Sequence, residues 1–194
     1  MNGDVYITGD ADKDALINSD GTALLIGMQL DQQVPMEWAF MSPWTLRQRL
    51  GHLDVNRIAA MEESEFVAVC CDKPAIHRFP AVMGRRIHAM CVVLAERHGG
   101  QTEQLWATAR TGSELYDRLC ELPGYGEEKS QIFVALLAKR FGVRPRGWES
   151  AAGVFADNEP RTIADCRDPS SLARVREWKR IQREAKKDKQ GRDL

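Results

Sequence analysis

The amino-acid sequence predicts an all-α protein. In segment after segment, apolar residues recur at intervals of three or four, and prolines, glycines and capping residues stand at the borders. No stretch alternates polar and apolar residues as a strand does, and no segment repeats. The 194 residues, 43% hydrophobic and 28% charged, are enough for one good core or for two small lobes that share one.

The first half of the chain predicts five helices after a polar start. Residues 1–20 are acidic with two apolar points, which predicts a mobile start and a short helix. Thr22 is the expected cap of the first long helix. Pro43 falls inside the second apolar pattern and should kink or restart that helix, whereas Pro80 opens a long one. The expected helices are 23–33, 35–50, 55–61, 63–71 and 80–98.

The second half predicts a helical hairpin and a basic terminal helix. A short helix around Trp106 leads to the hairpin, and Asp168 with Pro169 marks the start of the last helix, in which Ile181 is the outermost candidate for the inner face. The expected helices are 113–121, 127–141, 148–155 and 169–187. The expected domains are a mobile acidic start (1–20), a helical domain (21–156), and a C-terminal helix with a basic tail that packs on the first lobe (157–194).

The charges are distributed unevenly along the chain. The net charge of −1 does not by itself indicate a nucleic-acid partner. The start is acidic, however, and the end is basic, as expected for a protein with one face toward phosphate. A solvated terminal helix explains the tail equally well. The basic residues of the end are Arg174, Arg176, Lys179, Arg180, Arg183, Lys186, Lys187, Lys189 and Arg192.

Several classes of protein are disfavoured by composition. The acidic start does not resemble a signal peptide, and no apolar run approaches a membrane span, so we expect a cytoplasmic protein without membrane partners, nucleoid-associated if bacterial. No two of the five cysteines form a Cys-x-x-Cys pair, which argues against a zinc site or a disulfide framework. The cysteines are Cys70, Cys71, Cys91, Cys120 and Cys166.

The most informative stretch is the joint Leu122-Pro123-Gly124-Tyr125-Gly126 between two predicted helices. Its two glycines let the backbone turn sharply and present N–H groups outward, just before a helix N-terminus. Unpaired donors and the helix dipole favour an anion there. Such a hairpin suits a nucleic-acid phosphate. An αα-turn with a glycine C-cap is the structural alternative.

This joint and its helices resemble the helix-hairpin-helix of the HhH-GPD superfamily of base-excision DNA glycosylases, the relatives of endonuclease III. The resemblance covers roughly residues 24–149. It implies two helical lobes with a cleft that the target base enters, and a monovalent cation bound at the hairpin as in relatives. Only Cys166 follows the hairpin, so the four-cysteine iron–sulfur loop of many relatives is absent and no other cofactor is expected.

The resemblance also assigns a catalytic carboxylate. Family members place an aspartate at a helix start shortly after Phe-Gly, where it stabilises positive charge on the sugar as the base leaves. Here Phe141-Gly142 is followed by Glu149 in that place, with Asp157 as the second candidate. A glutamate is one methylene longer than the family residue. The alternative for Glu149 is a first-turn carboxylate that only complements the helix dipole.

A second family residue is missing. Lyase members carry a nucleophilic lysine two positions after the second hairpin glycine, and Glu128 occupies that position here. Lys129 is one residue further and therefore turned by about 100°. We expect it to point away from the cleft, as a phosphate contact or a surface residue. The sequence thus predicts a monofunctional enzyme in which water attacks and no Schiff base forms.

Base excision also requires the target nucleotide to leave the stack. Gln32 matches the glutamine of the family's Ser-x-Gln segment, which enters the duplex, and is otherwise a polar helix end. The loop 77–79 is the second insertion candidate: His77 or Arg78 would probe the opposite base, and Phe79 would line the base pocket or be buried as a hydrophobic staple. The other pocket candidates, each of which would otherwise be core, are Trp38, Phe40, Trp44 and Tyr125.

Together these residues predict a monomeric DNA glycosylase that removes a damaged or mispaired base from duplex DNA bearing a lesion. The backbone N–H groups of Gly124, Tyr125 and Gly126 would hold a phosphate, with Lys129 beside them. The first alternative is a non-catalytic helix-hairpin-helix protein that binds distorted DNA. A helical protein–protein scaffold without a DNA role is the second.

Overall fold

The computed structural model describes residues 1–193, and all their regular elements are helices, which confirms the all-α prediction. Only two isolated β-bridges occur in this range, Thr111 with Arg146 and Lys187 with Asp193. The helices are α1 (Ala11–Ser19), α2 (Gly21–Leu30), α3 (Met36–Leu50), α4 (Val55–Ala59), α5 (Glu63–Cys71), α6 (Pro80–His98), α7 (Gln104–Ala107), α8 (Gly112–Cys120), α9 (Glu127–Arg140), α10 (Trp148–Ala152), η1 (Gly153–Ala156), η2 (Ile163–Asp165) and α11 (Pro169–Glu184).

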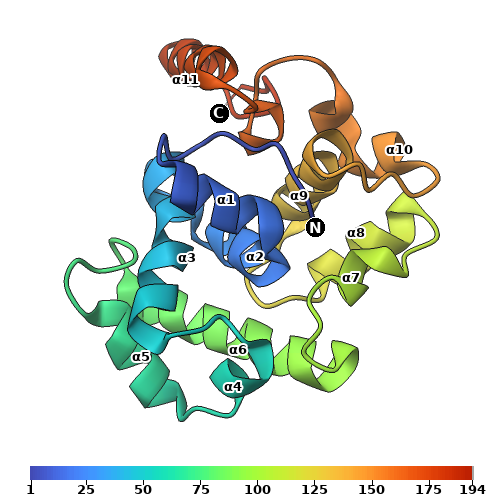
Figure 1. The fold of residues 1–194 in the computed structure, drawn as a ribbon. Helices are drawn as coiled ribbons and strands as arrows, with labels where there is room; N and C mark the ends of the chain where they lie inside the picture. The colour runs from blue at the N-terminus through green and yellow to red at the C-terminus, as the bar shows by residue number, and fades with distance from the viewer. Residues whose placement is uncertain (194) are drawn as a thin grey trace.

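Helix α2 lies at the centre of the molecule. All ten of its residues are buried, as expected for a helix that is apolar on nearly every side. In Figure 1, α4, α5 and α6 lie below α2 and α11 lies above it. The carboxylate of Asp20 accepts hydrogen bonds from the N–H groups of Thr22 and Ala23, so Asp20 caps this helix and the prediction of Thr22 was wrong.

Helices α3–α6 follow the sequence pattern closely. Helix α6 packs against α4 and α5, and its bounds and those of α5 are as predicted. Helix α3 continues through Pro43, which is buried within it, and so it does not restart there. Gly51 ends α3 in the left-handed conformation, with φ of 74°, which glycine adopts without strain.

The hairpin helices form the other side of the core. The apolar face of α9 is buried, and α10 packs against both α8 and α9. The predicted helix 148–155 is α10 followed by the 3₁₀ turn η1. The sequence did not predict η2, which is closed by a capping box between Thr162 and Asp165.

The N-terminal segment is part of the core, so the prediction of a mobile start was wrong. The side chains of Val5 and Ile7 are buried. The N–H of Tyr6 donates to the carbonyl of Cys166 (3.2 Å), and the N–H of Asp4 donates to that of Arg140 (3.2 Å). Two apolar residues are too few to show a periodic pattern, so the sequence did not predict this packing. Val5 and Ile7 nevertheless cover one end of the core, which is otherwise formed by residues far along the chain.

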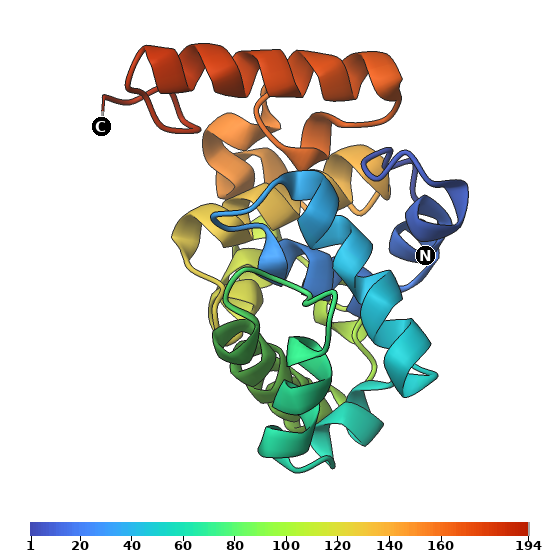
Figure 2. The same cartoon turned by 90° about the vertical axis from the view of Figure 1, so that its left-hand side faces the viewer.

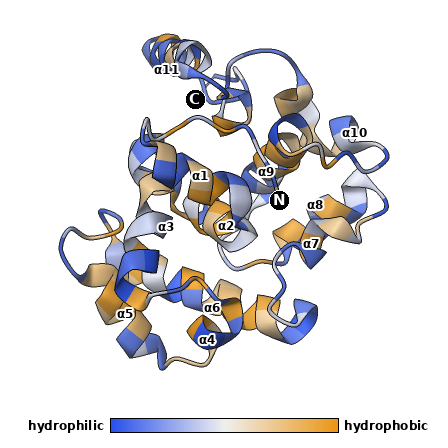
Figure 3. Cartoon of the chain, in the orientation of Figure 1, coloured by the Kyte–Doolittle hydropathy of each residue, from blue (hydrophilic) through white to orange (hydrophobic). Residues whose placement is uncertain are grey.

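Helix α11 lies across one end of the molecule (Figure 2). Its residues Leu172 and Val175 are buried, but Ile181, predicted for the inner face, is 46% exposed and is not on it. Hydrophilic residues dominate α11, whereas α2 is largely hydrophobic (Figure 3). The guanidinium of Arg176 pairs with Glu37 of α3 (2.5 Å), which ties α11 to the start of α3. None of the helices in residues 1–193 is both long enough and apolar enough to span a bilayer.

Candidate nucleic-acid interface

The hairpin turn lies at the surface with several backbone donors unused. Gly124 has φ of +85°, and Gly126 is the extended N-cap of α9; both are exposed. Within residues 1–193, no acceptor receives the N–H groups of Gly124, Gly126 or Glu127. The N–H of Tyr125 donates to Leu122 (3.0 Å), so the predicted phosphate contact by Tyr125 was wrong. The free donors are the two glycines and the first turn of α9.

The turn is held against the C-terminal half of α2. The phenol of Tyr125 donates to the carbonyl of Leu25 (2.8 Å), and the ammonium of Lys129 donates to that of Gln29 (2.9 Å). The ring of Tyr125 is buried and meets Phe133 edge-on, so it is a core residue and does not line a base pocket. The tight contact with α2 fixes the direction in which the turn faces.

Lys129 is neither a surface residue nor turned toward solvent. Its ammonium lies 5.6 Å from the centroid of the Tyr125 ring and points at α2. Burial lowers the pKa of Lys129 to about 8, and the nearby carboxylate of Asp31 opposes this shift. The expectation of a surface lysine was wrong, because the ammonium is held against the Gln29 carbonyl of α2.

Gln29 was not among the predicted site residues. It is completely buried, and neither atom of its amide has a hydrogen-bond partner within residues 1–193. A Cβ atom built on Gly124 would lie 2.1 Å from the Gln29 Nε2, so the two residues are in close contact. Gln29 could have been recognised in the sequence as a polar amide side chain within a nearly apolar helix, where a buried polar group needs a partner.

Gln32 and the loop 77–79 meet directly, although 45 residues separate them. The His77 Nε2 lies 2.9 Å from the Gln32 carbonyl, and the His77 Nδ1 accepts from the N–H of Phe79 (3.0 Å), so Nε2 carries the proton. Burial lowers the pKa of His77, and its ring is only 1% exposed. The prediction that His77 probes the opposite base was wrong, because both nitrogens are used to hold the loop.

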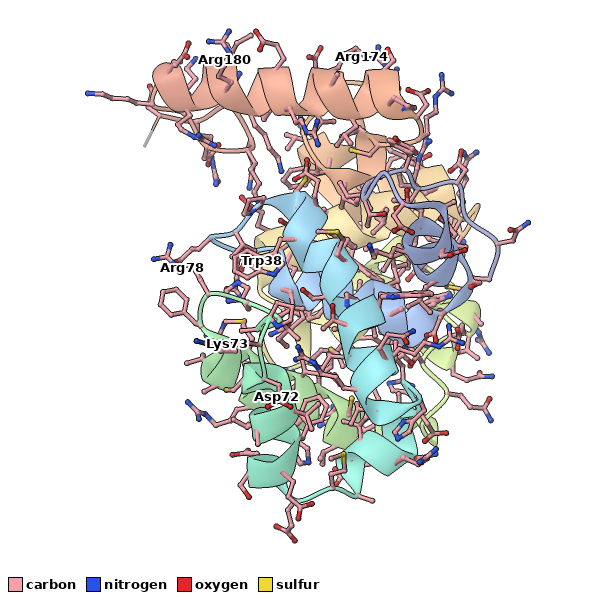
Figure 4. The ribbon with its side chains drawn as sticks, turned by 60° about the vertical axis from the view of Figure 1, so that its left-hand side comes forward. Trp38, Asp72, Lys73, Arg78, Arg174 and Arg180 are labelled. Atoms are coloured by element: carbon pink, nitrogen blue, oxygen red, sulfur yellow. The ribbon has the colours of Figure 1, made fainter. Side chains whose placement is uncertain are left out.

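The tip of this loop is open to solvent. The guanidinium of Arg78 lies 4.6 Å from the centroid of the Phe79 ring, and Phe79 is 43% exposed. The alternative of a buried hydrophobic staple at Phe79 was therefore wrong. Trp38 stacks on His77 with ring centroids 6.3 Å apart, and Arg78 projects outward beside it (Figure 4). Trp44 packs against the core instead.

Phe40 is also a core residue, since none of its surface is exposed. The aromatic residues proposed for one base pocket therefore divide into two groups. Trp38 and Phe79 flank His77, whereas Phe40 and Tyr125 are buried and Trp44 is partly buried against the core. A periodic pattern cannot separate these groups because it does not show which face of α3 the loop 72–79 covers.

Two residues that the sequence analysis missed fix the loop 72–79 from α3. The Ser42 hydroxyl donates to the carbonyl of Ile76 (2.7 Å). The guanidinium of Arg49 donates to the carbonyls of Val69 (2.8 Å) and Pro74 (2.7 Å). With His77, these contacts attach the loop at three points and leave its tip, Arg78 and Phe79, presented to solvent.

Above Gln32, an open groove of about 830 Å³ separates the α2–α3 connection from α11 and the tail. The ammonium of Lys189 in the tail lies 3.4 Å from the carboxylate of Glu128, which joins the far wall of the groove to the hairpin. The lining residues are Asp31, Gln32, Gln33, Val34, Pro35, Met36, Glu37, Glu128, Arg176, Trp178, Lys179, Arg180, Gln182, Arg183, Lys187, Asp188 and Lys189.

The predicted catalytic residue Glu149 does not line this groove. It is exposed in the first turn of α10, a helix that packs on the hairpin helices. Asp157, the second candidate, is paired with the guanidinium of Arg161 (2.7 Å). The catalytic role of Glu149 remains a prediction, and the groove instead contains the carboxylates of Asp31, Glu37, Glu128 and Asp188.

Nothing in residues 1–193 forms a group of three or more His, Cys, Asp or Glu side chains suited to a metal ion. Burial raises the pKa of the Cys70, Cys91 and Cys166 thiols to about 12. These thiols therefore stay protonated and behave as core residues. Cys120 is only partly buried, and its thiol contacts the hydroxyl of Ser130 (3.3 Å).

Comparison with known proteins identified no relative of this chain. The chain matches no family model, and it has no significant match among curated proteins or solved structures.

Proposed function

We propose that the protein is a monofunctional DNA glycosylase that hydrolyses the N-glycosidic bond of a damaged or mispaired base, with the two-lobed architecture of the HhH-GPD superfamily. Its partner is duplex DNA bearing a lesion, and it acts as a monomer.

One observation carries the proposal. The hairpin turn, the loop 77–79 and the segment with Gln32 were each chosen separately for DNA contact, and all three meet at the C-terminal half of α2. The hairpin reaches the carbonyls of Leu25 and Gln29, and the loop 77–79 reaches that of Gln32. The exposed donors of the turn and the exposed tip, Arg78 and Phe79, thereby belong to one surface built on one helix. A phosphate contact and a wedge beside it are what base extrusion needs.

The proposed reaction uses one carboxylate and no amine nucleophile. Glu149 supplies the fixed anion that stabilises the developing positive charge on the sugar. Glu128 stands where lyase members have an amine, so no Schiff base forms and water is the nucleophile.

The test is base release by Glu149→Gln. The carboxylate is exposed, so the amide should leave folding and DNA affinity unchanged, while base release falls by about 10²–10³-fold. Base release is measured on a panel of lesion-bearing duplexes by strand scission in hot alkali. Normal cleavage by this variant would show that the carboxylate is assigned wrongly.

A second function is favoured by the position of Glu149 outside the groove lining. In this alternative, the protein binds distorted DNA through the same surface and performs no chemistry. Binding to several lesion duplexes without scission of any of them would select this function over the enzymatic one.

A further inference from the structure

The end of the chain carries a charge opposite to that of the rest. Residues 169–194 contain nine Lys and Arg against four Asp and Glu and so have a net charge of +5, whereas the whole chain has −1. In the structure this segment forms α11 and the tail, which make one wall of the groove. The groove thus has a strongly cationic side that no acidic segment of the chain neutralises fully.

Several of these cations face the groove without a counter-ion. Within residues 1–193, no carboxylate lies within 4.0 Å of the side-chain nitrogens of Lys179, Arg183 or Lys187. The ammonium of Lys179 is turned inward against the sulfur of Met36, and burial lowers the pKa of Lys179. The carboxylates of Asp31 and Glu37 oppose this shift, but neither forms an ion pair with Lys179, so the site favours an additional anion.

A neutral group in the same wall is also unpaired. The Gln182 Oε1 is buried and has no donor within residues 1–193. Gln182 lies one turn from Lys179 on α11, and both line the groove. An unpartnered amide beside an ammonium that forms no ion pair is expected where a polar ligand completes the surface.

The cations follow the helix axis as a row. Arg176, Lys179 and Arg183 are three or four residues apart, so they share a face of α11 and extend over roughly 10 Å at 1.5 Å per residue. Lys187 and Lys189 continue the row to Glu128 in the first turn of α9. A linear row that ends at the unused donors of the hairpin suits a linear polyanion better than a compact one.

We propose that the inner face of α11 and the tail form a second DNA-backbone-binding surface, continuous with the hairpin, which holds the phosphates of a strand flanking the target nucleotide. Lys189 pairs with Glu128 in the free protein and exchanges this carboxylate for a phosphate when DNA enters. The inference rests on the DNA-binding part of the proposed function and is independent of base excision.

Two arginines of α11 provide a matched test. Arg183 lines the groove, whereas Arg174 is on the outer side of the helix (Figure 4); both are exposed and neither is ion-paired within residues 1–193. The affinity of Arg183→Ala and Arg174→Ala for a fluorescent duplex is measured against salt concentration. Arg183→Ala should lower the slope of log K against log[salt] by about 0.9, and Arg174→Ala should match the wild-type protein.

The outcomes separate the two proposals. Equal slopes for both variants, in a wild-type protein that binds DNA, would overturn the groove surface and leave the proposed function standing. Failure of the wild-type protein to bind any duplex would overturn both. An acidic polyglutamate that competes with DNA at equal charge would identify a protein partner and also overturn the assignment.

Chemical labelling gives a measurement that needs no variant. Lysine acetylation of the whole protein is followed by mass spectrometry with and without the duplex. DNA should reduce the acetylation of Lys187 and Lys189 several-fold. The acetylation of Lys13 on α1, which pairs with Asp10, should not change. Unchanged labelling of all three lysines at saturating DNA would contradict the proposal.

Discussion

Gly124 and Gly126 are two residues apart in the hairpin turn, yet the reasons for glycine differ. Gly124 has a positive φ, and a Cβ atom there would collide with the buried amide of Gln29. Gly126 has φ of −91°, and a Cβ atom there would meet nothing within 4 Å. Packing and backbone conformation account for Gly124, whereas Gly126 is under neither constraint, as expected if a ligand approaches the turn there.

Alanine at the two positions should therefore separate stability from binding. Gly124→Ala is expected to destabilise the fold by about 1–3 kcal/mol through strain at positive φ, with a further cost from the clash. Gly126→Ala should keep the melting temperature nearly unchanged and weaken duplex binding, because the methyl group stands between the amides and a phosphate. Thermal denaturation and fluorescence anisotropy check both. Wild-type affinity in Gly126→Ala would mean that no ligand approaches the turn.

Lys129 makes stability depend on pH. Its pKa is lowered to about 8 in the folded protein, so between pH 8 and 10.5 the unfolded chain binds the proton that the folded protein has lost. Stability contributed by this residue therefore rises with pH in that window. Below pH 8, the cost of burying the charged amine is present in full.

Lys129→Met should remove that dependence. The wild-type protein should gain up to about 3 kcal/mol relative to the variant between pH 8 and 10.5, because a shift of one pKa unit corresponds to about 1.4 kcal/mol. Urea unfolding at several pH values measures the difference. Lys187→Met, at an exposed position, is the control, and its difference from wild type should stay constant. A constant difference for Lys129→Met would mean that the amine is solvated.

At the scale of elements, the loop 72–79 behaves as a fixed arm although it has no regular structure. Arg49, Ser42 and His77 each bond it to a neighbouring element. Arg78 and Phe79, which follow the anchored His77, are exposed and uncommitted to the core. A wedge that enters DNA must be held before it binds, and these anchors provide the support.

His77→Ala should release this arm. The change leaves the Gln32 carbonyl and the Phe79 N–H without their partner, at a cost of about 1–3 kcal/mol. Hydrogen exchange should accelerate in residues 72–79 while α6 stays protected. Phe79→Ala removes an exposed ring and is the control, with exchange in the loop close to wild type. Equal protection in both variants would show that the other anchors suffice.

Local chemistry explains which elements the sequence predicts well. Pro80 and Gly99 determine the bounds of α6, and Asp54 caps α4, because these residues act on their own neighbours. The hairpin was predicted for the same reason. The sites of His77 and Lys129 were not, because their surroundings come from α2, and a chain pattern does not show which distant helix covers a residue. Glu149 was proposed from the family resemblance and its distance from Phe141-Gly142, which do not place it relative to the groove.

At the scale of the whole molecule, the two ends of the chain close the structure. The N-terminal segment places Val5 and Ile7 in the core and bonds to residues 140 and 166. Helix α11 then crosses the same end and is tied to α3 by Arg176. The core of the hairpin half is therefore complete only when both ends are in place.

Ile7→Ala should destabilise the protein by about 2–5 kcal/mol, since Ile7 has no exposed surface and the change leaves a cavity. Ile181→Ala is the matched control, because that isoleucine is 46% exposed and its loss should change stability by no more than about 0.5 kcal/mol. Chemical denaturation measures both. Equal stabilities would mean that the N-terminal segment is detached in solution.

Because α2 is enclosed, the proposed DNA surface should keep its geometry until the whole protein unfolds. The carbonyls of Leu25, Gln29 and Gln32 that receive the hairpin and the loop belong to this enclosed helix and to the turn that follows it. Its amides have no route to water by fraying, so they should exchange with deuterium only when the entire protein opens. Partial melting at the periphery would leave the geometry of the surface intact, and heating should abolish DNA binding and tertiary structure in one cooperative step.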